Sequence, residues 1–113
     1  RGRGTLIFTG ATASTRGREG FAAFAAAKAG LRALAQSLAR ELGPEGVHVA
    51  HVVIDGAVDG TFIRSIRGEV DDLLARDNIL KPADVAANYV HLHRQPRSAW
   101  THELDLRPWS ETW

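Results

Sequence analysis

The residue pair best suited to chemistry is Phe24 and Lys28, which lie four positions apart in an alanine-rich segment. In a helix this spacing places both side chains on the same face. Lys28 interrupts an otherwise apolar stripe, so its ammonium either reaches water along an apolar stem or faces a site. Helix geometry alone favours the first interpretation, and other motifs in the chain must decide between the two.

A second candidate site follows the apolar run Val47–Ile54, where Asp55 and Gly56 break the pattern. Open α/β sheets bind ligands beyond the carboxyl ends of their parallel strands. An Asp-Gly pair is also typical of a plain tight turn, and position alone does not separate the two interpretations.

The histidines do not form a recognisable metal site. His48 and His51 are three apart, which puts them on opposite faces of a strand, and His91 and His93 are two apart, which separates them on a helix. Cysteine is absent, which excludes thiolate catalysis, disulfides and cysteine-based zinc sites. We therefore expect no metal.

Two apolar runs on either side of a long helix would position these residues. Thr5–Thr9 is a short continuous run of strand formers, typical of a strand buried on both faces. A small polar loop, 11–20, leads from it to the helix, and Val47–Ile54 is the second strand. Strand, helix and strand in this order predict a parallel β-α-β unit, normally right-handed.

The helix is predicted over Phe21–Leu42, and Gly43-Pro44 ends it. Its large apolar side chains recur at intervals of three, four or seven residues: Phe21, Phe24, Leu31, Leu34, Leu38 and Leu42. This spacing indicates one apolar stripe facing the sheet.

The remaining elements are shorter. We expect a loop through Asp59–Thr61, a weak helix over Arg67–Arg76, and a helix that starts at Lys81-Pro82 and runs to about Arg94. Glu103–Arg107 alternates apolar and polar residues and predicts a more exposed third strand.

Length and composition limit the possible functions. The 113 residues make one domain, 1–113, with a net charge of +1, so we expect no nucleic-acid partner. No apolar run approaches the roughly 20 residues of a membrane span, and the absence of cysteine fits a cytoplasmic protein. Methionine is absent and the chain opens with Arg1-Gly2, so we interpret it as part of a longer protein.

Four segments, in order, resemble the carboxyl-terminal half of the short-chain dehydrogenase/reductase family. Residues 4–8 are similar to its G-x-I-V-N strand, and residues 21–49 to its Y-x-A-S-K helix and the following A-x-E-L…G-I-R-V strand. Residues 54–59 resemble its P-G-x-V-x-T loop, and residues 81–86 its P-E-D-V-A helix. The resemblance implies an α/β fold, a partial Rossmann-type doubly wound parallel sheet made of the last three strands.

The resemblance also implies a catalytic set that this chain lacks in part. In the family a Tyr is the general acid/base, a Lys four residues later lowers the pKa of that Tyr, and a Ser binds the substrate oxygen. Phe24 stands at the Tyr position and Ala11 at the Ser position, while Lys28 is retained. Thr12 is a weak candidate for the missing hydroxyl, and Tyr89 lies on a later helix.

By the same resemblance, the family's cofactor is NAD or NADP. Lys28 would hold the nicotinamide ribose, and Asp55, Gly56 and Val58 would contact the nicotinamide. The family's G-x-x-x-G-x-G phosphate loop does not occur in this sequence, so we expect no tight cofactor binding by this chain alone.

Two function classes remain open. The first is a nicotinamide-dependent oxidoreductase acting on a small-molecule carbonyl or alcohol, inactive as this chain alone. The second is a noncatalytic family member that serves in oligomerisation or ligand binding. In both cases we expect a homo-oligomer or pairing with an amino-terminal half.

Overall fold

A computed structural model describes residues 3–113; Arg1 and Gly2, which open the sequence, lie outside the described residues. The sheet has three parallel strands, β1 (Gly4–Ala11), β2 (Val47–Ile54) and β3 (Glu103–Leu106), in the order β1-β2-β3. The central strand is therefore β2, and it is buried along most of its length.

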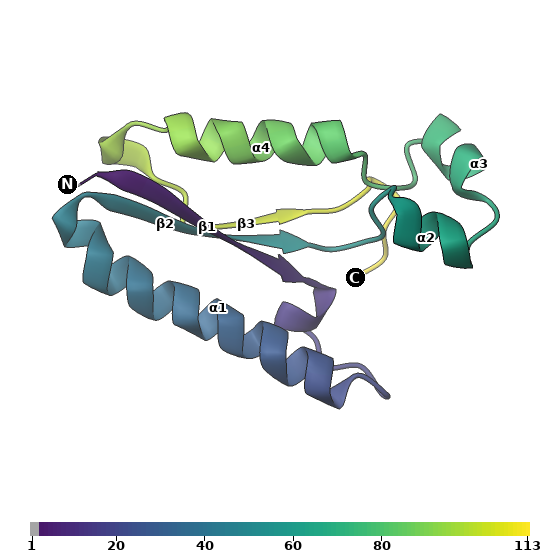
Figure 1. Ribbon diagram of the computed structural model, residues 1–113, viewed down its shortest axis with the longest axis horizontal. Helices are drawn as coiled ribbons and strands as arrows, with labels where there is room; N and C mark the ends of the chain where they lie inside the picture. The colour runs from purple at the N-terminus through teal and green to yellow at the C-terminus, as the bar shows by residue number, and fades with distance from the viewer. Residues whose placement is uncertain (1–2) are drawn as a thin grey trace.

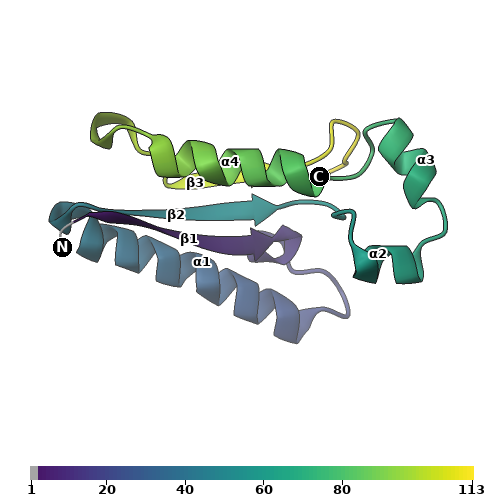
Figure 2. The same cartoon turned by 45° about the horizontal axis from the view of Figure 1, so that its top comes forward.

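Helices cover both faces of this sheet. The long helix α1 (Ala22–Leu42) lies along one face and α4 (Pro82–Arg94) along the other (Figure 1, Figure 2). This layering confirms the expected α/β class and the partial, doubly wound Rossmann-type sheet. Three short 3-10 turns complete the connections: η1 (Thr12–Ser14), η2 (Gly43–Glu45) and η3 (Arg97–Ala99).

The two crossover connections have opposite hands. The parallel strands step in one direction across the sheet, yet α1 and α4 lie on opposite faces (Figure 2). Right-handed connections in both places would have put both helices on one face. One crossover therefore runs against the usual preference, and segment 55–81, between β2 and α4, lies beyond the carboxyl ends of the strands (Figure 1).

Helix α1 forms where the sequence predicts it, with Phe21 as its N-cap residue. Only part of the predicted apolar stripe, however, is buried against the sheet. Phe21, Phe24 and Leu34 are 50%, 49% and 47% exposed, whereas Ala35 is fully buried. Phe24 shares a helix face with Lys28 and with the buried Ala35, so its exposure reflects its position near the start of α1. We call Phe21, Phe24 and Leu34 the exposed apolar side chains of α1.

The expectation that the first strand is buried on both faces is wrong. Leu6 is 37% exposed and Thr9 is exposed as well. Among the described residues β1 pairs only with β2, so one edge of the strand is open and its side chains are only partly covered.

Segment 55–81 contains a helix that the sequence did not indicate. Helix α2 spans Thr61–Ile66, and α3 spans Val70–Ala75, a shorter range than the predicted helix. Six residues are too few for a helix to be stable on its own. Arg64 supports α2 from its polar side, with ion pairs to Asp59 and Asp71.

The core lies between the sheet and α4. Ala50, Val52 and Leu92 are buried there, and partly buried apolar side chains of all three strands pack around them. His48 points toward the same side and stacks on Trp100, with ring centroids 4.7 Å apart. Trp100 therefore packs against β2. Among residues 3–113 no helix combines the length and the apolar character needed to cross a membrane.

Candidate functional site

The candidate site forms where β1 and β2 end side by side. Ala11 pairs with Ile54 at the last position of the shared register, so the residues that follow each strand are neighbours. Thr12 and Asp55 meet there, and the Thr12 hydroxyl donates a 2.7 Å hydrogen bond to Asp55 Oδ1. The loop after β1 and the loop after β2 therefore contact each other at the carboxyl ends of the strands.

Asp55 is the buried charge of this site, with only 2% of its surface exposed. Arg16 Nη2 donates to its Oδ1 at 2.8 Å, and Arg107 Nε lies 3.6 Å from its Oδ2. Burial by itself raises the pKa of Asp55, but the hydrogen bonds from Thr12 and Arg16 and the two positive charges outweigh it, and the net pKa is lowered. Asp55 is therefore ionised near neutral pH and holds both arginines over the strand ends.

Lys28 is half-buried and reaches the same end of the sheet. Its Nζ donates to the Thr9 carbonyl at 3.2 Å and lies 6.0 Å from the centroid of the Phe24 ring. The shared helix face predicted for the two residues is confirmed. The lysine is directed at β1, and the Thr9 carbonyl is its one hydrogen-bond partner in the part of the chain that the structure describes.

Within residues 3–113, no phenol lies beside Lys28. Phe24 and Ala11 carry no exchangeable side-chain proton, and Tyr89 hydrogen-bonds the Thr9 hydroxyl from α4, on the opposite face of the sheet. The Ser14 hydroxyl accepts a hydrogen bond from the Ala11 amide at 2.9 Å and is buried, so it caps a turn.

The loop after β2 is fixed by packing as well as by charge. Gly56 has φ 148°, and a Cβ at this position would lie 2.9 Å from Cδ of Pro108. Val58 then forms a parallel bridge with Leu80, close to the start of α4. Only glycine fits such a backbone against Pro108, so the loop is more than a plain exposed turn.

A second polar cluster, which the sequence analysis missed, joins α1 to β3. Arg32 donates two hydrogen bonds of 2.8 Å to the carboxylate of Glu103, and His51 Nδ1 lies 3.1 Å from Glu103 Oε2. The Arg32 hydrogen bonds lower the pKa of Glu103 to about 2, and the His51 contact adds to the shift. Glu103 lies on the face of β3 opposite the core residue Leu104, so the alternating pattern alone did not distinguish it from an exposed carboxylate. As predicted, His51 lies on the face opposite His48.

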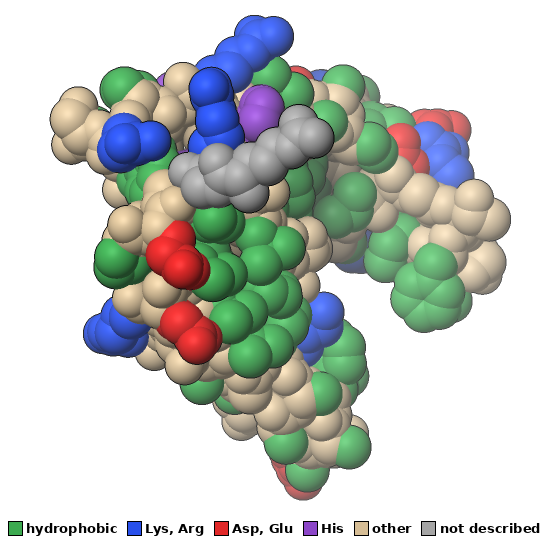
Figure 3. Space-filling model, turned by 60° about the vertical axis from the view of Figure 1, so that its left-hand side comes forward, with side chains coloured by type: hydrophobic (Ala, Val, Ile, Leu, Met, Phe, Trp, Pro, Cys, Tyr) green, Lys and Arg blue, Asp and Glu red, His purple; other side chains and the backbone are tan. Residues whose placement is uncertain are grey.

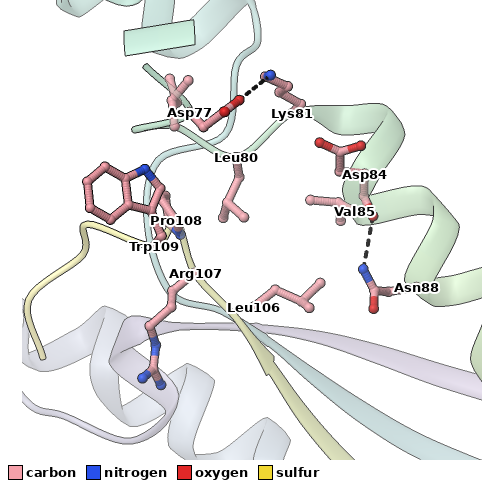
Figure 4. Close-up of a pocket in the computed structure, with 11 residues that line it drawn as sticks. Asp77, Leu80, Lys81, Asp84, Val85, Asn88, Leu106, Arg107, Pro108 and Trp109 are labelled. Atoms are coloured by element: carbon pink, nitrogen blue, oxygen red, sulfur yellow. Dashed lines mark hydrogen bonds and ion pairs between the residues drawn. The ribbon is translucent and has the colours of Figure 1, made fainter. Parts of the chain in front are cut away.

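Figure 4 shows a cavity of about 450 Å³ on the α4 side of the sheet edge. Two of its charged lining residues, Lys81 and Asp77, pair with each other, and Arg107 points out of the cavity (Figure 4) and pairs with Asp55. Within residues 3–113 no group of three potential metal ligands gathers. The residues best placed to bind a ligand or take part in a reaction therefore lie around Asp55 and Lys28.

Comparison with known proteins agrees with this arrangement. A family model described as enoyl-(acyl carrier protein) reductase matches residues 1–102. The chain is 48% identical to a short-chain dehydrogenase from Rhodopseudomonas palustris, with a TM-score of 0.70 over 96% of this chain and 40% of that one. It is 31% identical to a short-chain dehydrogenase from Burkholderia cenocepacia in complex with NADP, with a TM-score of 0.73 over 93% of this chain and 44% of that one.

A serine dehydrogenase complexed with NADP+ shares the fold, with a TM-score of 0.79 at 24% identity, over 99% of this chain and 47% of that one. The chain thus spans less than half the length of these three structures. The chain belongs to the short-chain dehydrogenase/reductase family.

Proposed function

We propose that this chain is the carboxyl-terminal half, residues 1–113, of a nicotinamide-dependent oxidoreductase domain that has lost its proton-donating group. The single observation that carries this proposal is the geometry around Lys28. The lysine side chain extends to the carboxyl end of β1, beside a phenylalanine where the family has a tyrosine. Lys28, which would face the cofactor, is retained, whereas the general acid that would donate the proton is missing.

The residues at this edge fit the nicotinamide end of NAD or NADP. An ammonium has three N–H groups, and Lys28 uses one on the Thr9 carbonyl, which leaves donors for ribose hydroxyls. The backbone of Gly56 and Val58 is fixed by contacts with Pro108 and Leu80. The hydrogen bond between Thr12 and Asp55 ties the start of this loop to the loop after β1. The phosphate-binding end would need the glycine-rich loop that this sequence does not contain.

When bound, the nicotinamide would supply or accept a hydride at a small-molecule carbonyl or alcohol. Reduction of a carbonyl leaves an alkoxide that must take a proton, and neither Phe24 nor Ala11 has one to give. Loss of a positioned general acid costs about 10²–10⁴-fold in rate. Thr12, whose hydroxyl is engaged with Asp55, replaces neither group without breaking that hydrogen bond.

The test is restoration of the acid in the protein that carries this chain. Oxidation of NADH and NADPH is followed with a panel of carbonyls, for the natural sequence, Phe24→Tyr, and Phe24→Tyr with Ala11→Ser. We expect no turnover by the 113-residue chain, slow turnover by the natural protein, and an increase of about 10²-fold or more in Phe24→Tyr.

Phe24→Leu is the matched control, because it changes the ring without adding a hydroxyl. Turnover by the natural protein at the rate of the restored variant would overturn the proposal. An increase in Phe24→Leu equal to that in Phe24→Tyr would also overturn it.

A noncatalytic role is the second candidate, favoured by the exposed apolar side chains of α1. Phe21, Phe24 and Leu34 are each about half exposed, and Figure 3 shows a patch of hydrophobic side chains near the centre of the view. In this case the protein acts through oligomerisation or ligand binding, and Phe24→Tyr produces no turnover although cofactor binds.

The open edge of β1 supports pairing with an amino-terminal half or with a second copy, since exposed strand edges recruit partners. We also propose a cytoplasmic location, in keeping with a chain that contains no cysteine.

A further inference from the structure

A polar cavity of about 480 Å³ lies at the carboxyl edge of the sheet, over the loop that contains Gly56. Three arginines line it, from two segments that are distant in sequence. Arg16 and Arg18 come from the loop between β1 and α1, and Arg67 comes from the segment that follows α2. Glu111 is the one carboxylate among the lining residues.

The three guanidinium groups are held differently. Arg16 is anchored by Asp55, and Arg67 pairs with the exposed Glu69 at 2.7 Å. Arg18 lies over the ring of Phe21, 5.6 Å from its centroid, and has no carboxylate partner within residues 3–113. A guanidinium carries five N–H donors, so each arginine keeps donors for a further acceptor.

This cavity lies beside the reaction centre rather than apart from it. Thr12 and Gly56 line it together with the arginines, and the loop that carries Arg16 and Arg18 leads directly into the helix of Phe24 and Lys28. A substrate whose carbonyl lay near Lys28 would therefore extend toward the arginines. Planar guanidinium groups match carboxylate and phosphate oxygens in geometry and charge.

We propose that this cavity binds the anionic group, a carboxylate or a phosphate, of the substrate. The identification of this anion as part of the substrate rests on the oxidoreductase function proposed above, whereas the anion site itself does not. The chemical class that follows is an oxo or hydroxy acid, or a phosphorylated carbonyl compound.

Binding of simple anions tests the site without any turnover. Glutarate and inorganic phosphate are titrated into the protein by calorimetry at constant ionic strength set with sodium chloride. We expect saturable binding of at least one of them, weakened about tenfold or more in Arg18→Gln and in Arg67→Gln. Arg40→Gln, at an exposed position in the last turn of α1, is the matched control and should bind like the natural protein.

The remaining arms separate the possible sources of the anion. Arg18→Lys keeps the charge but not the planar fork, so partial recovery of affinity relative to Arg18→Gln supports direct contact. Equal affinity in Arg18→Gln and Arg40→Gln would overturn the site. If nicotinamide mononucleotide binds in an Arg18-dependent way while glutarate and phosphate do not, the anion belongs to the cofactor, and the assignment to the substrate is wrong.

Failure of the proposed oxidoreductase function would look different. In that case Phe24→Tyr yields no turnover, while glutarate or phosphate still binds and still depends on Arg18.

Discussion

Asp55 shows how one residue joins the parts of this site. Its carboxylate accepts hydrogen bonds from Thr12 and Arg16, in the loop between β1 and α1, and lies near Arg107, which follows β3. A buried charge is stable only when it is paired and hydrogen-bonded. Asp55 is therefore a positioning residue for the arginines as well as a part of the candidate cofactor loop.

Replacement of Asp55 by Asn should destabilise the fold by about 3 kcal/mol, because it leaves two arginines without their buried partner. This loss lies at the low end of the range for removing one partner of a buried ion pair, because the Arg16 side chain is 36% exposed. Urea unfolding measures the change. Asp72→Asn is the control: its ion pair with Arg76 is exposed, so the loss should stay below about 1 kcal/mol. Equal losses in the two variants would contradict the role given to Asp55.

Glu103 makes stability depend on pH in the acid range. Its pKa is about 2 in the folded state, against an ordinary value of 4.5, so the folded state favours the ionised form. This stabilisation is complete above about pH 4.5 and is lost as the pH falls toward 2, by at most about 3 kcal/mol. Between pH 5 and about pH 2.5 the free energy of unfolding should change less in Glu103→Gln than in the natural chain, as measured by urea unfolding across this range. A pH dependence identical to that of the natural chain would show that the Arg32 pair contributes nothing.

At the scale of elements, Gly10 leaves room beside β1 for the His51 ring and for η1, because it has no side chain. A Cβ on Gly10 would collide with Nε2 of His51 and lie 2.6 Å from Ser14 Oγ. His51 is fully buried and held by Glu103, so it has little room to move. The close approach of η1 to the sheet therefore depends on this glycine.

Gly10→Ala should cost about 1–3 kcal/mol, as expected for overpacking. Gly30→Ala, in the interior of α1 with nothing within 4 Å of its Cβ, should instead stabilise the chain by up to about 1 kcal/mol. Thermal unfolding of the two variants distinguishes them by sign. Stabilisation by Gly10→Ala would mean that His51 is not held where the structure places it.

At the scale of the whole molecule, two features lack a partner within residues 3–113: the open edge of β1 and the exposed apolar side chains of α1. Clustered exposed apolar side chains are typical of protein contacts. Their arrangement on neighbouring elements supports the proposal that the protein associates with itself or with a complementary half.

Sedimentation at micromolar concentration should show species heavier than the 12.3 kDa monomer. Leu34→Lys should shift the distribution toward the monomer, because it places a charge among the exposed apolar side chains of α1. Ala29→Lys is the control, because it is exposed but lies on a different side of the same helix. A monodisperse monomer of the natural chain would contradict the association proposal.

Local sequence was sufficient to predict most elements. Apolar runs, alanine content and the Gly-Pro and Lys-Pro signals located β1, α1, β2 and α4 within a few residues, because strand and helix preferences act over short distances. The spacing of Phe24 and Lys28 placed them on one helix face for the same reason. Helix α2 was not predicted because its six residues are too few for a periodic apolar pattern, and its ion pairs join it to residues outside the helix.

Only the tertiary structure decided which polar residues meet. The Asp55 carboxylate lies 39 and 43 positions from Arg16 and Thr12, and Glu103 lies 71 positions from Arg32. Neither pairing leaves a periodic signal, because each depends on how α1 and the strand ends pack against each other. The same packing placed Ala35 in the core and left Phe24 outside: burial depends on the distance between helix and sheet, which hydrophobic spacing alone does not specify.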